Sequence, residues 1–437
     1  MDAQKNKHAA IIADEQNALI YKEGELYLED VALKDIAAKV GTPVYCYSTS
    51  ALTRNFLSFK NACDASSPLI CFAVKANSNL AILRLLASLG SGADVVSEGE
   101  LRKAIAAGIK AEKIVFAGVG KKPAEIRFAI TAGIAQFNVE SEAELETIAK
   151  ESKALGKQAP IALRINPDVD AGTNTKVTTG TRHTKFGIPA SRMLDVYSQL
   201  CANPWLIPRG LSVHIGSQLT SLGPFKYAFD QVITLVRDLR SLEMPVDTID
   251  LGGGLGVTYD AEEPPSFNEY GKLIQAVTAE LDCEVILEPG RCLVATAGVL
   301  LSEVILNKSQ ESRSIVVLDA AFNDLLRPGL YEAYHKIVPV RTDASSRPSR
   351  RVDYVGPICE TSDTFCLDEE ATELAAGDLV AILTTGAYGA VMASTYNTRP
   401  LVPEVLVRGT EFEVIRRRES YAEMLNRDVL PSWMAGV

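Results

Sequence analysis

The chain has 437 residues, 47% of them hydrophobic and 23% charged, and a formal net charge of −11. This length predicts two domains, and the acidic balance argues against nucleic acid or an anionic membrane as a partner. The start of the chain lacks the apolar run of a secretory signal, and no stretch of about 18 apolar residues predicts a membrane span. The eight scattered cysteines contain no C-x-x-C pair, so we expect a cytoplasmic protein without a metal site.

Short, almost continuously apolar runs recur from residue 70 onward, and each is followed by a helix-like stretch. Such runs are typical of parallel strands that are buried on both faces. Eight strand–helix units predict an α/β fold, a (β/α)8 barrel of the TIM type over residues 46–300, with an open doubly wound sheet as the alternative. The expected strands are 70–76, 92–97, 113–119, 136–140, 161–167, 210–216, 248–254 and 284–290.

Several intervening segments carry the boundary signals of helices. Ser97 stands three residues before Glu100, which is the spacing of a capping box. Pro123 suits the start of another helix and Gly133 suits the position after its end. These signals strengthen the prediction of alternating strands and helices.

After about residue 300 the rhythm changes to strand-like runs that are separated by turns. We therefore predict a C-terminal, mainly β domain over residues 301–437, with one helix around residues 322–337. Residues 1–45 also contain strand-like pieces, and we expect this segment to pack with the β domain.

Polar residues fall where the barrel strands are expected to end, which is where barrel active sites lie. Lys75 is either a strand-end lysine that extends into solvent or a partly buried amine that forms a Schiff base. Gly252–Gly254 are either a tight turn or a loop whose backbone approaches a phosphate, with Ser217 as a further phosphate ligand. The residues at these ends are Lys75, Asp94, Arg164, His214, Gly252–Gly254, Glu288 and Arg291.

Glu288, Arg291 and His214 each allow two interpretations. Glu288 and Arg291 form an internal ion pair, or the carboxylate faces a pyridine nitrogen and favours its protonated form. His214 is a satisfied core histidine, or it stacks on a flat cofactor ring. Their position at one end of the barrel favours a role in a cofactor site.

The expected β domain contributes further candidates. A lone cysteine such as Cys359 is more often a small buried hydrophobe than an acid. Arg327 and Tyr331 are one helical turn apart, so they can face one ligand together, and an arginine suits a carboxylate. Tyr388 lies between two glycines and is either a packing aromatic or a ligand contact.

Eight motifs, in this order, resemble the diaminopimelate decarboxylase family. The resemblance runs from about residue 17 to the C-terminus, and the eight motifs together are highly specific. They are FAVKAN (72–77), DVVSEGEL (94–101), HIGSQ (214–218), GGGLG (252–256), EPGR (288–291), NDLLRPGLYEAYH (323–335), GPICE (356–360) and GAYGAVMASTYNTRP (386–400).

The resemblance implies a fold-type III enzyme with an alanine-racemase-like barrel and pyridoxal 5'-phosphate as its cofactor. It implies a carboxy-lyase that converts meso-diaminopimelate to L-lysine and CO2, the last step of lysine biosynthesis. It further implies a head-to-tail homodimer in which Cys359, the catalytic cysteine, reaches the site of the second subunit, while Lys75 carries the cofactor. The implied cofactor-binding residues are Lys75, Asp94, His214, Ser217, Gly252, Gly253, Gly254, Glu288, Pro289, Gly290, Arg291 and Tyr388. The implied substrate-binding residues are Arg291, Arg327, Tyr331, Glu360 and Tyr388.

Two departures from the family pattern concern loops. Ala321-Phe322 stands where Gly-Met is usual, and Thr184 stands where a serine commonly precedes KFG, within the loop 177–188. The alternatives are a decarboxylase of ornithine, arginine or carboxynorspermidine, an amino-acid racemase on the same barrel, and a non-catalytic homologue. Glu360 and Tyr331 argue against the first, Cys359 in place of a tyrosine against the second, and the retained Lys75 against the third.

Overall fold

A computed structural model of the chain describes residues 18–169, 184–309, 313–342 and 347–434, so most of the loop 177–188 lies outside the described residues. The chain forms two compact units. One consists of Leu52–Ala295, and the other combines Met1–Ala51 with Thr296–Val437. Within the described ranges, none of the helices is long and apolar enough to cross a bilayer.

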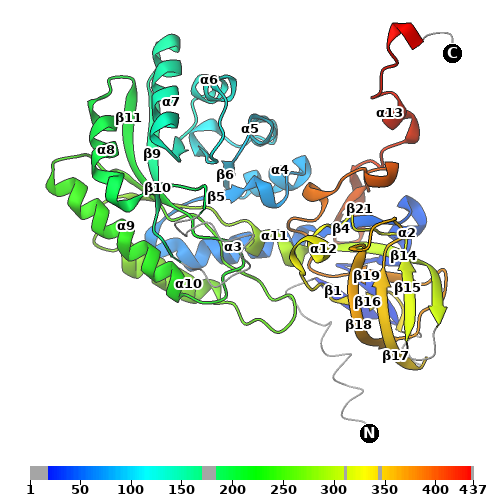
Figure 1. The fold of residues 1–437 in the computed structure, drawn as a ribbon. Coiled ribbons are helices and arrows are strands. Elements are labelled where there is room, and N and C mark those ends of the chain that lie inside the picture. The colour runs from blue at the N-terminus through cyan, green and yellow to red at the C-terminus, as the bar shows by residue number, and fades with distance from the viewer. Residues whose placement is uncertain (1–17, 170–183, 310–312, 343–346, 435–437) are drawn as a thin grey trace. The chain divides into compact units, whose positions relative to one another are not determined.

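Eight parallel strands close the first unit into a barrel (Figure 1). Each strand pairs with the next in chain order, and the last, β13, pairs with the first, β5. This closure confirms the predicted barrel and excludes the open sheet. The strands are β5 (Leu69–Ala73), β6 (Gly92–Val95), β7 (Ile114–Phe116), β8 (Gln136–Val139), β9 (Ala159–Asn166), β11 (Leu206–Val213), β12 (Thr248–Asp250) and β13 (Glu284–Leu287), with a short β10 (Ile188–Pro189) beside β9.

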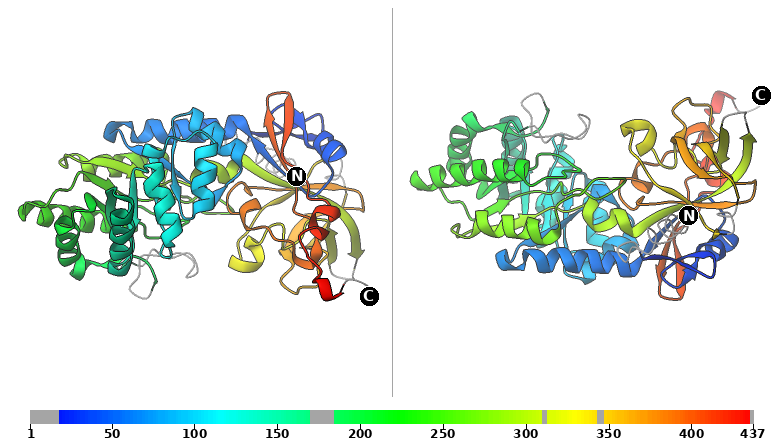
Figure 2. Two further views of the ribbon diagram at one scale, coloured as in Figure 1. Left: turned by 90° about the horizontal axis from the view of Figure 1, so that it is seen from above. Right: turned by 90° about the horizontal axis from the view of Figure 1, so that it is seen from below.

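Helices follow the strands and lie on the outside of the barrel (Figure 2). The Ser97 hydroxyl accepts the Glu100 N–H at 3.2 Å, and Gly133 ends another helix in the left-handed conformation, with φ of 75°. Both features confirm the boundary signals. The helices are α3 (Thr49–Cys63), α4 (Leu80–Ser88), α5 (Glu98–Ala106), α6 (Pro123–Ala132), α7 (Glu142–Leu155), α8 (Met193–Ala202), α9 (Gly223–Ser241), α10 (Phe267–Thr278) and α11 (Arg291–Val294).

Helices α3, α9 and α10 pack through a cluster of aromatic rings. The Tyr270 ring lies 5.2 Å from that of Phe225 and 6.0 Å from that of Phe59, centroid to centroid. All three side chains are fully buried, and burying each ring stabilises the fold by roughly 1.5–3 kcal/mol. An added Cβ at Gly271 would lie 1.9 Å from the Ala62 carbonyl oxygen, so glycine permits this close approach of α10 to α3.

The barrel strands also carry buried polar side chains, which is unusual for residues removed from water. Buried charged and amide groups need partners, because an unsatisfied polar group costs about 1–3 kcal/mol. The strands therefore provide an internal hydrogen-bonding network near their carboxyl ends. The buried polar residues concerned are Asp94, Gln136, Asn138, Arg164, Asp250 and Glu288.

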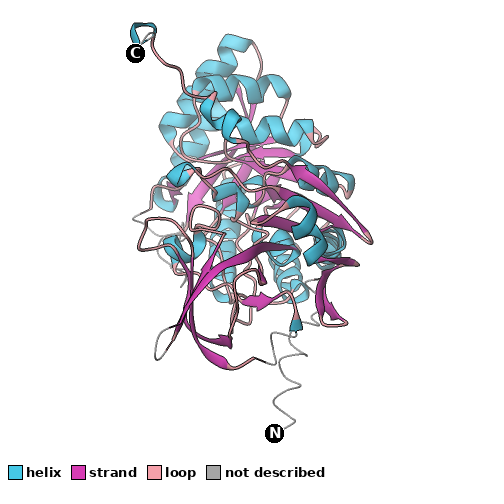
Figure 3. Ribbon diagram, turned by 90° about the vertical axis from the view of Figure 1, so that its right-hand side faces the viewer, coloured by secondary structure: helices cyan, strands magenta, loops and turns pink. Residues whose placement is uncertain are grey.

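The second unit is mainly β, as Figure 3 shows by its strands. Its long strand β14 pairs antiparallel with β4, β15 and β19, and β4 also pairs parallel with β20. A core of aliphatic side chains fills this unit, including Leu26, Val44, Val299 and Val405. Its strands are β1 (Leu19–Lys22), β2 (Glu25–Leu28), β3 (Val31–Ala32), β4 (Val44–Ser48), β14 (Gly298–Ser309), β15 (Ser314–Leu318), β16 (Ile337–Pro339), β17 (Ser349–Val355), β18 (Thr364–Thr372), β19 (Leu379–Ile382), β20 (Glu404–Arg408) and β21 (Glu411–Arg416).

The helix expected around residues 322–337 is much shorter than predicted. The structure forms only α12 (Arg327–Tyr331), and Glu332 leaves the helix in the left-handed region with φ of 56°. Pro328 suits the first turn of a helix but cannot lie further inside one, so α12 begins close to it. The unit also contains α2 (Leu33–Val40) and α13 (Tyr421–Leu425).

Candidate active site

Lys75 lies in a single 3-10 turn (Val74–Ala76) that directly follows β5. Its Nζ is 3.1 Å from Oδ2 of Asp94, which is fully buried on β6, while the Lys75 side chain is 33% exposed. The amine is therefore half-buried and held by a carboxylate, in contrast to a lysine that extends into solvent. Among the described residues, the buried Oδ1 of Asp94 has no hydrogen-bond partner. Such an oxygen is costly to leave unsatisfied and indicates a site that a ligand completes.

His214 follows β11 and contacts the glycine turn after β12. Its Nδ1 accepts the Gly253 N–H at 3.2 Å, and its carbonyl oxygen accepts Nη2 of Arg164 at 3.1 Å. Burial, with the positive charges of Lys75 and Arg164, holds the pKa of His214 well below its usual range. The imidazole is therefore neutral at pH 7, and its Nδ1 carries no proton because it accepts a hydrogen bond.

Close backbone contacts explain the run Gly252–Gly254. An added Cβ would lie 2.3 Å from the Val213 oxygen at Gly252, 2.0 Å from the Glu288 oxygen at Gly253 and 2.5 Å from the Gly216 oxygen at Gly254. Gly252 and Gly254 also have positive φ values of 66° and 117°. No other residue type fits three such positions, and of the three only Gly254 is partly exposed.

Gly253→Ala is expected to destabilise the barrel by about 1–3 kcal/mol, because the new methyl group overlaps the Glu288 carbonyl and forces β12 away from β13. Urea denaturation of the two proteins measures the difference in free energy of unfolding. Gly223→Ala is the matched control, since a Cβ there meets no described atom within 4 Å. Equal stability of Gly253→Ala and wild type would contradict this close packing.

Arg291 and Ser217 meet beside the glycine turn. The Ser217 hydroxyl accepts hydrogen bonds from Nη2 of Arg291 at 3.0 Å and from its Nε at 3.3 Å. Nη1 of Arg291 donates to the Tyr259 hydroxyl at 2.7 Å. These contacts fix a buried guanidinium in one orientation, as recognition of a carboxylate or phosphate requires.

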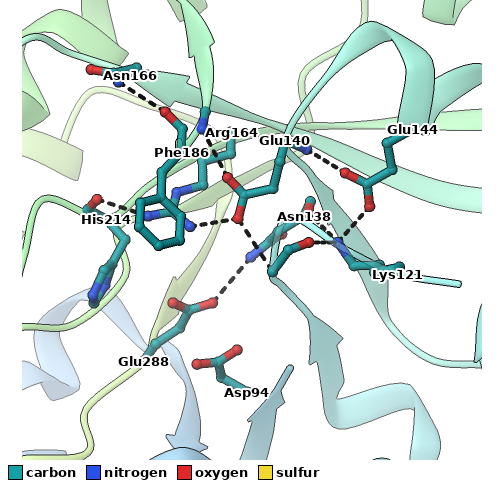
Figure 4. Close-up of polar contacts among 12 residues, drawn as sticks. Asp94, Lys121, Asn138, Glu140, Glu144, Arg164, Asn166, Phe186, His214 and Glu288 are labelled. Carbon is teal, nitrogen blue, oxygen red and sulfur yellow. Dashed lines mark hydrogen bonds and ion pairs between the residues drawn. The ribbon is translucent and has the colours of Figure 1, made fainter. Parts of the chain in front are cut away.

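Glu288, at the end of β13, is bound by an amide from across the barrel. Nδ2 of Asn138 donates to Oε1 of Glu288 at 3.1 Å (Figure 4). The same nitrogen donates to Oδ2 of Asp250 at 2.8 Å. Burial and the carboxylates of Asp250 and Asp94 raise the pKa of Glu288 well above its usual range. Glu288 is thus one of three neighbouring buried acids, with Asp94 and Asp250, and its raised pKa favours the protonated carboxyl.

The EPG segment also packs against the turn that carries Lys75. The Pro289 carbonyl accepts the Ala73 N–H at 3.0 Å, and an added Cβ at Gly290 would lie 3.0 Å from Cβ of Ala73. The chain after β13 is therefore held close to the end of β5. Sequence positions 75 and 288 are brought together by this contact.

Two ion pairs surround the buried acidic residues Asp94, Asp250 and Glu288. Arg164 contacts Glu140 at 2.6 Å, and the buried Nζ of Lys121 contacts Glu144 at 2.6 Å (Figure 4). Glu140 also accepts the Gly187 N–H at 2.9 Å, which ties the chain before β10 to the end of β8. Each cation has its own carboxylate, so the pairs shape the site without adding net charge.

In the second unit, Arg327 and Tyr331 lie at the two ends of α12, and Arg327 is buried. Nε of Arg327 donates to Nε2 of His335 at 3.3 Å, and Nδ1 of His335 lies 2.9 Å from the Leu383 oxygen. Since Nε2 is the acceptor, His335 is neutral and donates from Nδ1 to that carbonyl. His335 thereby orients the Arg327 guanidinium.

Cys359 and Glu360 lie in an exposed loop that Asp363 organises. Oδ2 of Asp363 accepts the Ile358 N–H at 2.8 Å, and the Cys359 N–H donates to Oδ1 of Asn397 at 3.3 Å. The Cys359 thiol is exposed, so the interpretation as a small buried hydrophobe is wrong.

Tyr388 is partly buried and has a positive φ of 55°. This conformation is strained for a residue with a large side chain and is typical of functional positions. It supports a ligand contact over simple packing.

The structure brings Lys75, Asp94, His214, Ser217, Gly252–Gly254 and Glu288–Arg291 to one end of the barrel, and it places Arg327, Tyr331, Cys359, Glu360 and Tyr388 in the second unit. Sequence reasoning missed residues that hold these side chains. Asp250 lies two residues before the glycine run, and Asn138 lies within the fourth strand run, so their positions carried a signal. Tyr259 and His335 carried none. The missed residues are Asn138, Glu140, Asp250, Tyr259 and His335.

Comparisons with known proteins agree with this geometry. Residues 49–295 match the family described as pyridoxal-dependent decarboxylase, pyridoxal binding domain. The chain is 48% identical over 418 residues to the diaminopimelate decarboxylase of Zymomonas mobilis, covering 94% of this chain and 99% of that one. It is similar in structure to diaminopimelate decarboxylase from Helicobacter pylori complexed with L-lysine, with a TM-score of 0.87, 40% identity and coverage of 90% and 98%. The M. jannaschii enzyme in complex with L-lysine gives a TM-score of 0.91 at 35% identity, covering 96% and 99%.

Proposed function

The chain belongs to the diaminopimelate decarboxylases, a family of pyridoxal-dependent decarboxylases, and from this premise we propose a role for each residue of the site. The protein is a carboxy-lyase that converts diaminopimelate to lysine and CO2 in lysine biosynthesis, with pyridoxal phosphate as its cofactor. The observation that carries the proposed roles is the half-buried pair of Lys75 and Asp94 beside the glycine turn.

The residues at the end of the barrel fit this cofactor. The triple-glycine turn carries no side chains, so its backbone N–H groups suit a phosphate, and Ser217 adds a hydroxyl. The neutral His214 ring suits stacking on a flat heterocycle, and Glu288 suits its ring nitrogen. Asp94 contacts Lys75 through Oδ2, and its Oδ1 has no partner among the described residues, so the residues present have the chemistry that the cofactor needs.

When bound, the cofactor supplies an aldehyde that captures the substrate amine and a ring that accepts the electron pair left by CO2. Lys75 attaches the cofactor through Nζ, and Asp94 holds this amine in place. Glu288 keeps a positive charge at the ring nitrogen favourable, which makes the ring a better electron acceptor. Pro289 and Gly290 hold Glu288 close to the segment that carries Lys75.

The substrate has a second amino-acid end that the chain must recognise. Arg291 and Arg327 provide guanidinium groups for its distal carboxylate, and Glu360 provides the charge that suits its ammonium. Tyr331 and Tyr388 complete the contacts to substrate and cofactor. His335 supports this recognition because it orients the Arg327 guanidinium.

We assign the final proton transfer to Cys359, whose Sγ delivers a proton to Cα after CO2 has left. Exposure of this thiol in the single chain supports its presentation to a second subunit, in a homodimer whose active sites each use residues of both chains. We assign the protein to the cytoplasm, because its cysteines are free thiols, which is the usage of a reducing compartment.

The assay that tests the function uses the purified full chain with pyridoxal phosphate and meso-diaminopimelate. Equal amounts of CO2 and L-lysine are expected, with at least about a hundredfold lower turnover of ornithine or arginine, because neither has a distal carboxylate for the two arginines. Turnover of ornithine without turnover of meso-diaminopimelate would contradict the substrate assignment. Isomerisation of an amino acid without release of CO2 would indicate the racemase.

A further inference from the structure

Two carboxyl groups lie side by side inside the barrel: Asp250 is the last residue of β12, and Glu288 directly follows the neighbouring strand β13. Asp250 is fully buried, and Glu288 is 5% exposed. Oδ1 of Asp250 accepts the Gly252 N–H at 2.9 Å, and Oδ2 accepts Nδ2 of Asn138 at 2.8 Å. The same amide nitrogen donates to Glu288 at 3.1 Å, so Asn138 bridges the two acids. Gln136 in turn donates to Oδ1 of Asn138 at 2.8 Å, which fixes the orientation of the bridging amide.

The two carboxyl groups lie close enough for one amide nitrogen to donate to both. Two negative charges this close in a buried site repel each other, so one of the two acids keeps a proton. Asp250 already accepts one N–H on each oxygen, and hydrogen bonds of this kind favour the charged form. The proton therefore lies on Glu288, and Asp250 is the carboxylate.

The surrounding charges lead to the same result. Burial raises the pKa of Asp250 to about 6 and that of Glu288 well above its usual range. The cation near them, Lys75, has the carboxylate of Asp94 as its partner. Other titratable groups face the pair from β5 and α10, and both stay neutral because burial raises their pKa values; these groups are Cys71 and Tyr270.

We propose that Asp250 is a positioning residue, which keeps one proton on Glu288 and so reserves a place for a single positive charge at this end of the barrel. Asn138 holds the two acids at the distance that this sharing requires. A protonated ring nitrogen beside Glu288 is the positive charge that fits the place, an identification that rests on the proposed function. With such a charge beside it, Glu288 is ionised and Asp250 remains a carboxylate.

Infrared spectroscopy of the full chain without cofactor tests the shared proton, because a protonated carboxyl group has its own carbonyl band. The measurement is made at pH 8, since burial gives Glu100 and Asp324 pKa values of about 7 and about 6, and both are then largely ionised. Wild type should show a band that Glu288→Gln lacks and that shifts in deuterated water. This difference identifies Glu288 as the proton carrier.

Asp250→Asn should lower the pH at which the Glu288 band disappears, because the charge of Asp250 is then absent, while burial and Asp94 still raise the pKa of Glu288. Asp247→Asn is the matched control; it lies three residues earlier, its side chain is 61% exposed, and it should keep the band. Asp250→Ala removes the carboxylate without adding an amide and serves if Asp250→Asn does not fold. Addition of pyridoxal phosphate to wild type should also remove the band.

Two results would overturn this role of Asp250: absence of a Glu288 band in wild type, or a band that disappears at the same pH in wild type and in both Asp250 variants. Neither depends on turnover. A protein that makes lysine but lacks the band would support the proposed function and contradict the proton on Glu288. A protein that has the band but makes no lysine would support the proton and contradict the proposed function.

The pH dependence of the free energy of unfolding is a second test of this acid pair. The carboxyl of Asp250 has an ordinary pKa of 3.8 and a folded value of about 6, so between these pH values the folded chain binds a second proton, on Asp250, in addition to the one on Glu288. Its contribution to stability is complete below about pH 4 and is lost as the pH rises through 6. Over this range the ratio of folded to unfolded cofactor-free chain should fall about a hundredfold more in wild type than in Asp250→Asn. Parallel curves for the two proteins would contradict a buried proton at this pair.

Discussion

Lys75→Ala abolishes the visible absorbance of the bound cofactor and lowers turnover by about a thousandfold or more. Without Nζ the chain has no amine beside Asp94 to attach the aldehyde, so the cofactor is neither held covalently nor positioned for the substrate. Absorption spectra of the purified protein, together with lysine production, measure both effects. Lys75→Arg should fail equally, since a guanidinium stays protonated and cannot act as the nucleophile.

Lys113→Ala is the matched control for this change. Lys113 lies at the start of β7, at the opposite end of the barrel strands, and its Nζ donates to the Gly90 carbonyl at 3.3 Å. Its removal should leave both the absorbance and the turnover unchanged. A Lys75→Ala protein that keeps the visible band would show that the cofactor is attached elsewhere.

Cys359→Ala is expected to keep the visible band and to lower kcat by about 10²–10⁴-fold, the range for loss of a positioned general acid. In the roles proposed above, barrel residues hold the cofactor, whereas the exposed thiol of the second unit provides the proton. Cys201→Ala is the control, because this exposed cysteine on α8 should be dispensable. Unchanged kcat in Cys359→Ala would exclude the thiol as the acid.

Mixing the two inactive proteins tests which subunit provides the thiol. If each site combines Lys75 of one chain with Cys359 of the other, a mixed dimer of Lys75→Ala and Cys359→Ala has one intact site. Half of the dimers are mixed after random exchange of subunits, so activity should return to about a quarter of that of wild type. No recovery, with exchange verified by a tag on one chain, would place both residues of a site on the same chain.

The barrel could be predicted from the sequence because each strand has a local signal, a short and almost continuously apolar run. Each of the eight predicted runs overlaps a strand of the barrel, and helices α5 and α6 have the predicted capping residues. The candidate site followed from one geometric rule, that the ends of parallel strands meet. This rule needs no knowledge of which strands are neighbours.

The residues that hold the site could not be predicted in the same way. Asn138 contacts Asp250 and Glu288 over separations of 112 and 150 residues, and nothing near Asn138 in the sequence indicates these partners. The length of helix α12 was predicted wrongly for a different reason. A helix-like sequence pattern continues past Tyr331, but the backbone leaves the helix at Glu332. Local sequence patterns were enough to predict the helices and strands. The contacts that hold the site residues join positions far apart in the sequence, and local patterns do not indicate them.

The pairing of β4 with β14 and β20 has a consequence for synthesis of the protein. β4 ends at Ser48, whereas β14 begins at Gly298, so the ribosome makes the whole barrel before the first strand of the later sheet can find its neighbours. A nascent chain that stops before Gly298 carries an unpaired, apolar edge, which is a template for association with other chains. Chaperones that bind extended apolar segments should therefore engage residues 44–48 during translation and release them once β14 has emerged.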